Sequence, residues 1–274
     1  KNGSIRTPQS IQSYATLATI IFQTNQNEQH GGQAIPAFDF FMAKGVAKSF
    51  RKHLASFINF YVAMENGTQA DEKAIRTLIK EHLPSIKSTE AERETLRIAL
   101  VALQIIIDKE HLTRIAEKAY QQTKKDTHQA MEGFIHNLNT MHSRGGNQVV
   151  FSSINYGTDT SAEGRLVIEE LLKATIEGLG TRGEVPVFPI QIFKVKDGVS
   201  YSEKDFEKAM GAENIEDAMR ETYEAPNFDL LLRACQTTSK ALFPNFMFLD
   251  TPFNKNEKWK ADDPKRYIYE LATM

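Results

Sequence analysis

The stretch VVFSSINYG, residues 149–157, decides the fold class of this chain. Its β-branched and aromatic residues, closed by a glycine, are typical of a strand, and its nearly continuous apolar character is typical of a strand buried on both faces. Similar stretches follow at residues 185–195 (VPVFPIQIFKV) and 246–250 (FMFLD), with helical patterns at residues 162–179 and 227–242 between them. This alternation predicts an α/β fold, with the three strands in one mixed or parallel sheet and helices outside it.

The N-terminal half carries helical patterns instead. An N-cap and an N1 proline at residues 7–8 begin a first helix that should end near Phe22. Residues 23–33 (QTNQNEQHGGQ) have neither helical period nor apolar content, which indicates a loop. A long helix is expected over residues 36–65, ended by the pair at residues 66–67. Three further helices are predicted over residues 71–82, 89–108 and 110–142.

Composition and charge narrow the classes of function. The chain has 274 residues, of which 41% are hydrophobic and 25% are charged, the usage of an ordinary globular protein. Its formal net charge is -2 and no run of Lys or Arg exceeds a pair, so no nucleic-acid polymer is expected as a partner. The longest apolar run, residues 98–107, is too short to span a membrane, which predicts a soluble protein. Cys235 is the single cysteine, which excludes an intrachain disulfide and fits a reducing, cytoplasmic setting.

Neither end of the sequence has the features expected of a natural terminus. Lys1 is not an initiator methionine, and no signal-peptide pattern follows it. The last residues, 270–274 (ELATM), supply neither a helix cap nor a polar tail. These features predict an internal piece of a longer protein.

The hydroxyl-rich turn after the first predicted strand is the strongest candidate for ligand binding. In α/β folds, ligands gather at the carboxyl ends of parallel strands. Ser152, Ser153 and Asn155 lie toward that end. The turn that contains Thr158 and Asp159 then leads directly into a helix, so its backbone N–H groups are suited to holding a phosphate.

A structural role for the same turn stays open beside the binding role. Thr160 or Ser161 can simply cap the helix that begins at residue 162, and capping is compatible with phosphate binding. Alternation along a strand places Ser153 and Asn155 on one face and the preceding serine on the other, unless a bulge turns them together. Ser153 and Asn155 are therefore the better candidates for contact with a ligand.

A second candidate is the loop formed by Gln29, His30, Gly31, Gly32 and Gln33. Its two glycines allow the backbone to approach a ligand closely, and its side chains can hydrogen-bond a base or a sugar. Paired glycines are also common in ordinary turns.

Two further groups of residues have chemical potential but favour ordinary roles. His128, Glu132 and His136 recur every four residues, which places them on one helix face that can bind a divalent metal. Such residues in a charged helix more often form a solvated stripe, so no metal site is predicted. Cys235 lies among leucine and alanine residues on a predicted helix, which favours a small buried apolar role over a nucleophile.

Four segments carry a resemblance to a known family. They are QNEQHGGQAIP at residues 26–36, FSSINYGTDTS at residues 151–161, FPIQIF at residues 188–193, and LFPNF at residues 242–246 with Leu249 and Asp250 after it. In this order they are similar to segments of the anaerobic, class III ribonucleoside-triphosphate reductases. The resemblance implies a glycyl-radical enzyme that reduces ribonucleoside triphosphates to their deoxy forms for DNA synthesis, with formate as the usual electron donor.

The resemblance also implies an architecture. The family's α/β barrel has ten strands in two antiparallel halves of five parallel strands, and a finger loop through its centre carries the cysteine that becomes a thiyl radical. That cysteine is expected directly after residues 271–274, a second redox cysteine before Lys1, and the radical glycine and zinc-binding cysteines far beyond Met274. Cys235 matches none of these positions, so the piece alone is expected to be inactive.

Binding roles follow from the same resemblance. It places Ser152, Ser153, Asn155 and Asp159 near the nucleotide substrate, with Thr158 beside them. The mainly helical residues 1–144 are expected to build a homodimer interface with a site for deoxynucleotide or ATP effectors, and residues 145–274 to supply barrel strands. The loop at residues 29–33 is expected to link effector to substrate, and a radical-SAM activating enzyme is a further expected partner.

Two alternatives stay open at this point. One is a noncatalytic module that binds nucleotides and dimerises. The other is a different glycyl-radical enzyme, which shares the ten-stranded barrel but acts on small acids or alcohols.

Overall fold

The computed structural model describes residues 6–28, 31–67, 69–141 and 149–269. The first half contains the helices α1 (Ile11–Glu28), α2 (Phe38–Asn66), α3 (Glu72–His82), α4 (Glu90–Leu100) and α5 (Lys109–Thr140), with the short strand β1 (Gln33–Ile35) and the 3-10 turn η1 (Val101–Leu103). The second half contains β2 (Ser152–Tyr156), α6 (Ala162–Glu177), β3 (Ile190–Val195), α7 (Glu203–Met210), α8 (Ile215–Ala218), α9 (Phe228–Lys240), β4 (Asn245–Phe248), η2 (Pro252–Asn254) and α10 (Pro264–Tyr269).

The strands form one four-stranded sheet in which every neighbouring pair is parallel. Their order in the sheet is β1-β2-β3-β4, the same as their order in the chain. The prediction of one parallel sheet with helices outside is therefore confirmed for the three strands expected from the sequence. The fourth, β1, pairs with β2 through Gln33 opposite Ser152 and was not predicted, because three residues inside a polar stretch give no strand pattern.

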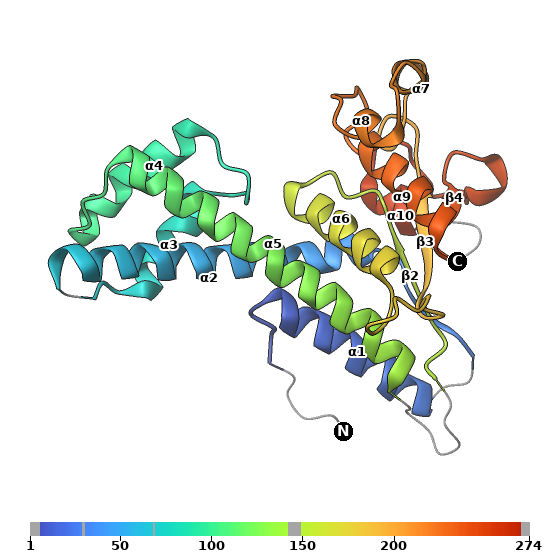
Figure 1. Ribbon diagram of the computed structural model, residues 1–274, viewed down its shortest axis with the longest axis horizontal. Helices are drawn as coiled ribbons and strands as arrows, with labels where there is room; N and C mark the ends of the chain where they lie inside the picture. Colours follow the sequence, from blue (N-terminus) through green and yellow to red (C-terminus); the bar gives the residue numbers. More distant parts are fainter. Residues whose placement is uncertain (1–5, 29–30, 68, 142–148, 270–274) are drawn as a thin grey trace.

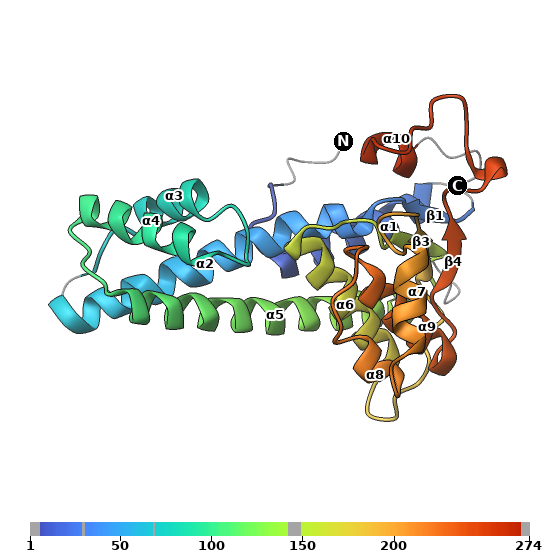
Figure 2. The same cartoon turned by 90° about the horizontal axis from the view of Figure 1, so that it is seen from above.

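The two faces of the sheet have different surroundings. Ile154, Tyr156 and Phe193 are buried in the main core. The Tyr156 hydroxyl donates to Gln191 (2.8 Å), and the Gln191 amide donates to Thr175 of α6 (2.9 Å), which joins this face to a helix. Because side chains alternate along a strand, the opposite face carries Ser153, Asn155, Ile192 and Lys194. Figure 2 shows α6 and α9 beside the strands and α10 near their carboxyl ends.

The long helices α2 and α5 extend away from the sheet, and α3 and α4 lie beside their far ends (Figure 1). One continuous core cluster nevertheless includes residues from α1 through to α9, so both halves of the chain share a core. None of the helices in the described residues combines the length and apolar character needed to cross a bilayer.

Capping side chains explain where several helices begin. Asp71, Thr89, Asp108 and Ser161 precede α3, α4, α5 and α6, and each accepts a hydrogen bond from a backbone N–H of the first turn. Thr89 forms a reciprocal capping box with Glu92. The N-cap role that the sequence allowed for Ser161 is confirmed.

Three predicted boundaries differ most from those in the structure. Helix α1 continues to Glu28 beyond Phe22, because the Gln26 side chain is buried and donates to the Val149 carbonyl (2.9 Å), so this polar stretch makes a tertiary contact. The helix predicted over residues 89–108 ends at Leu100, and Gln104 adopts a left-handed conformation with φ of 59°.

The third boundary is the start of the strand predicted over residues 185–195, which begins only at Ile190. Pro186 and Pro189 cannot donate to a strand ladder, which explains the late start. The helices α7 and α8, which follow this strand, were not predicted.

Candidate functional site at the carboxyl ends of the strands

The predicted ligand-binding residues of β2 lie on opposite faces of the sheet. Ser152 is buried on the helical face, where its hydroxyl donates to the Val150 carbonyl (3.1 Å). Ser153 and Asn155 share the other face, opposite Ile190 and Ile192 of β3. The regular parallel register from Ser153 to Tyr156 contains no bulge, so the alternation expected from the sequence is confirmed.

Asn155 has an unused hydrogen-bonding atom. Its side chain is only 5% exposed, and its Oδ1 atom has no hydrogen-bond partner among the described residues. Burial of a carbonyl oxygen without a donor costs on the order of 1–3 kcal/mol. Such an atom is rare in folded proteins and is expected where a ligand supplies the missing donor.

The turn after β2 is held by a residue that the sequence did not single out. Oδ2 of Asp39, in the first turn of α2, accepts hydrogen bonds from the backbone N–H groups of Gly157 (2.9 Å), Thr158 (3.1 Å) and Asp159 (3.1 Å). The three N–H groups that looked suited to a phosphate therefore already bind a carboxylate of the chain itself.

Burial dominates the electrostatics of this carboxylate. Asp39 is 1% exposed, and its burial raises its pKa from 3.8 to about 6. Hydrogen bonds from backbone groups oppose the shift, and the nearby charge of Asp159 adds to it. Asp39 therefore changes its charge near neutral pH, inside the fold.

Other polar groups of the turn also have partners within the protein. The Asp159 carboxylate accepts from the backbone N–H of Ser161 (2.9 Å), and burial raises its pKa. The Asn227 side-chain amide, directly before α9, donates to the carbonyls of Gly157 and Asp159, at 3.0 Å each. Thr158 and Asp159 are buried, and these hydrogen bonds join the turn after β2 to α2 and α9.

Lys194 is a second buried ionisable residue that sequence reasoning missed. It is buried in β3, and its Nζ atom donates to the carbonyls of Pro36 (2.9 Å) and Ile268 (3.1 Å). Burial lowers its pKa from 10.5 to about 8, and the negative charge of Asp39 partly opposes this. The sequence signal was a lysine inside a largely apolar strand.

The other predicted residues are placed as follows. Gln29 and His30 lie outside the described residues. Gly31 has φ of 97°, a conformation that favours glycine. Gln33 belongs to β1 rather than to a loop, and its amide donates to the Phe22 carbonyl (3.0 Å), which ties β1 to α1.

Cys235 does not occupy the buried position that was expected. It lies at the surface of α9, and partial desolvation raises the pKa of its thiol. The higher pKa disfavours the thiolate, so Cys235 has none of the activation that a nucleophile needs.

Comparison with known proteins identifies the family of the chain. A family profile described as anaerobic ribonucleoside-triphosphate reductase matches residues 1–270. The chain is also similar to the anaerobic ribonucleoside-triphosphate reductase of Escherichia coli (28% identical over 132 residues), to that of Enterobacteria phage T4 (29% over 129 residues) and to that of Haemophilus influenzae (27% over 138 residues).

These matches cover a limited part of each relative. They span 48%, 47% and 50% of this chain but only 16%, 18% and 16% of the three relatives, respectively. The family profile, in contrast, extends over nearly all of the chain and includes both the helical half and the parallel sheet. The chain therefore belongs to the anaerobic ribonucleoside-triphosphate reductase family.

Proposed function

We propose that the chain is part of the catalytic barrel of an enzyme that converts ribonucleoside triphosphates to deoxyribonucleoside triphosphates. In the reaction, the 2′-oxygen of the substrate leaves as water, while formate supplies two electrons and becomes carbon dioxide. Membership of the family and the parallel sheet support this assignment. In the proposed architecture, β1 to β4 form part of one half of the ten-stranded barrel.

Residues outside this chain carry the radical chemistry in this proposal. A structural zinc site of the cysteine type needs several thiolates, and the chain has one cysteine, at the surface. The residues present do not fit zinc held by cysteines, so no step is assigned to that zinc or to a thiyl radical here. In this proposal, the glycyl radical lies in the full-length protein, and a radical-SAM activating enzyme is its separate partner.

The substrate site is proposed on the face of β2 that carries Ser153 and Asn155. The Oδ1 atom of Asn155, which has no partner in the described part of the chain, is the observation that supports it best. This atom can only accept a hydrogen bond, a triphosphate at neutral pH offers acceptors, and a ribose offers hydroxyl donors. Asn155 is therefore assigned to a ribose hydroxyl and Ser153 to the same sugar or its neighbouring phosphate.

Thr158 and Asp159 have a different role in the proposed site. Their backbone N–H groups bind Asp39, so they hold the shape of the turn at the end of β2. Ser152 supports the strand from the helical side, through its bond to the Val150 carbonyl. Triphosphate oxygens would then be bound by groups other than these N–H donors.

The helical half is proposed to form the homodimer interface and the site for deoxynucleotide or ATP effectors. In the sequence, residues 29–32 directly precede β1, which begins at Gln33 and is the immediate neighbour of β2 in the sheet. A change in this segment would therefore reach the substrate face through one pair of adjacent strands. The proposal places the full-length enzyme in the cytoplasm.

Alanine variants of Asn155, Ser153 and Ser152 test the substrate site, and the two adjacent serines serve as a matched pair. Asn155→Ala in the full-length enzyme should weaken substrate affinity about ten- to hundredfold, because one or two hydrogen bonds to substrate are worth roughly 1–3 kcal/mol. Ser153→Ala should weaken it by up to about tenfold, and Ser152→Ala, on the opposite face, should leave affinity unchanged. Equilibrium binding of a ribonucleoside triphosphate and thermal unfolding would be measured on all three variants. A lower melting temperature of Asn155→Ala with unchanged affinity would refute the binding role.

A further inference from the structure

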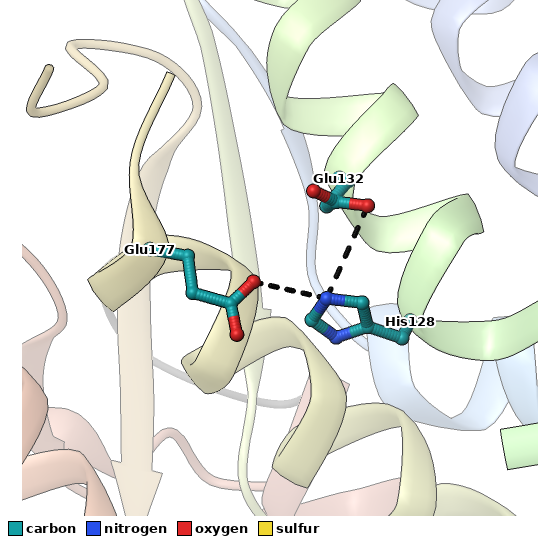
Figure 3. A group of neighbouring side chains, drawn as sticks. All are labelled: His128, Glu132 and Glu177. Atoms are coloured by element: carbon teal, nitrogen blue, oxygen red, sulfur yellow. Dashed lines mark ion pairs between the residues drawn. The ribbon is translucent and has the colours of Figure 1, made fainter. Parts of the chain in front are cut away.

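A cluster of one histidine and two glutamates bridges α5 and α6, on the side of the molecule away from the substrate face. The Nε2 atom of His128 in α5 lies 3.0 Å from a carboxylate oxygen of Glu177 in α6 and 3.9 Å from one of Glu132 in α5. One ligand atom from each residue lies within 4.8 Å of the other two. Figure 3 shows both carboxylates directed at the same ring nitrogen.

A fourth residue fixes the orientation of the imidazole. The Nδ1 atom of His128 lies 3.0 Å from Oε2 of Glu170, which is 2% exposed. The other oxygen of Glu170, Oε1, pairs with Lys173 (3.0 Å) and Lys124 (3.6 Å). The two lysines balance the charge of the Glu170 carboxylate, which accepts a hydrogen bond from the ring and so places an N–H of His128 at Nδ1. A carboxylate that orients a histidine through its second nitrogen is the usual arrangement behind a metal-binding imidazole.

This orientation leaves three acceptors facing one another. With its proton on Nδ1, the neutral ring presents a lone pair at Nε2 to two carboxylate oxygens, and lone pairs at such distances repel. A positive charge between them removes the repulsion, and it must be either a second proton on the ring or a cation. Glu177 is also the last residue of α6, so the negative end of the helix dipole adds to the attraction for a cation.

The geometry suits a transition metal. Bonds of roughly 2.0–2.2 Å to nitrogen and oxygen in a tetrahedral site separate the ligand atoms by roughly 3.3 Å, and the observed separations bracket that value. A groove of about 260 Å³, lined by Glu132 and His136 of α5 and by Ala174 and Gly178 at the end of α6, lies next to the cluster. It provides room for water to complete the coordination.

We propose that His128, Glu132 and Glu177 bind a divalent first-row transition metal such as Zn²⁺, with water in the remaining position. The metal joins the middle of α5 to the carboxyl end of α6, the helix whose other end follows the turn held by Asp39. The sequence pattern had suggested His128, Glu132 and His136, without predicting a site. In the fold, His136 contacts Thr140 instead (3.3 Å), and the third ligand comes from another helix.

Zn²⁺ binding to the full-length protein tests the site, with the number of ions per chain compared between wild type and variants. The resemblance implies a separate zinc held by cysteines, so the difference between proteins is the readout. Wild type should bind one more Zn²⁺ per chain than His128→Ala, Glu132→Gln or Glu177→Gln, and added Zn²⁺ should raise the melting temperature of wild type but not of these variants. Glu170→Gln should weaken Zn²⁺ affinity roughly ten- to hundredfold by disturbing the orientation of the ring.

His136→Ala is the matched control, since it lies on the same helix face two turns from His128 and outside the ligand set. It should bind the same number of Zn²⁺ ions as wild type. If His128→Ala fails to fold, the test relies on Glu132→Gln and Glu177→Gln. Both glutamates are exposed, so these substitutions cause little loss of packing. Equal Zn²⁺ content and equal Zn²⁺-dependent stability in wild type and in the Gln variants would overturn the proposal, and the cluster would then only join the two helices through contacts between its own side chains.

Discussion

Oδ2 of Asp39 lies 2.9 Å from the backbone nitrogen of Gly157, although 118 residues separate the two in the chain. This bond and its two neighbours fasten the first turn of α2 to the end of β2. The turn that follows the proposed substrate face is therefore positioned by a helix of the N-terminal half.

Removal of this carboxylate should destabilise the protein strongly. Asp39→Ala leaves three buried N–H groups without an acceptor, which should lower the free energy of unfolding by on the order of 3 kcal/mol or more. Asp39→Asn keeps one oxygen for the same groups and should cost clearly less. Urea unfolding of the two variants would measure the difference, and equal losses would contradict the hydrogen-bonding role.

The raised pKa of Asp39 predicts a pH dependence with a definite sign. The carboxyl binds its proton more tightly in the folded state (pKa about 6) than in the unfolded state (pKa near 3.8). Its contribution to stability is therefore fully present below about pH 4 and is lost as the pH rises through about 6, by up to about 3 kcal/mol.

Asp39→Asn provides the reference for that measurement, because asparagine does not titrate. The free energy of unfolding of wild type relative to Asp39→Asn should fall by most of this amount between pH 4 and pH 7. Carboxylates that do not interact with Asp39, such as Asp205 with its lowered pKa, contribute equally to both proteins and cancel. A constant difference between the two proteins across this range would show that the buried carboxyl is not the titrating group.

Two helical glycines give a matched pair for packing near the same turn. A Cβ atom at Gly164 in α6 would lie 2.1 Å from the carboxyl carbon of Asp159 and 2.5 Å from its Cβ, whereas a Cβ at Gly133 in α5 would meet nothing within 4 Å. Gly164→Ala should therefore lower the free energy of unfolding by roughly 1–3 kcal/mol through overpacking. Gly133→Ala should be neutral or stabilising by up to about 1 kcal/mol. Thermal or urea unfolding would measure the stability of both variants. Similar changes in the free energy of unfolding would rule out the close contact at Gly164.

The fold was predictable where a pattern lies within one element. The apolar run before Gly157 identifies a strand, and the helical period identifies α2 and α5. The parallel pairing of the strands follows from the alternation of strands and helices along the chain. The strand β1 could not be found this way, because the pairing of Gln33 with Ser152 is what makes it a strand.

The candidate sites show the same limit. Alternation assigned Ser153 and Asn155 to one face without a structure, but nothing in the sequence connects Asp39 with the turn at Gly157. The helical period likewise grouped His136 with His128, because a period relates only residues within the same helix. Glu177 approaches His128 across an interface between two helices, and such contacts depend on how the helices pack.

The strands β1 to β4 lie side by side in the order in which the chain contains them. During synthesis, the ribosome releases β1 first, and each later strand then emerges next to a partner that is already present. No strand pair has to separate to admit a later strand. The sheet can therefore grow in one direction while translation continues, with β4 as its leading edge.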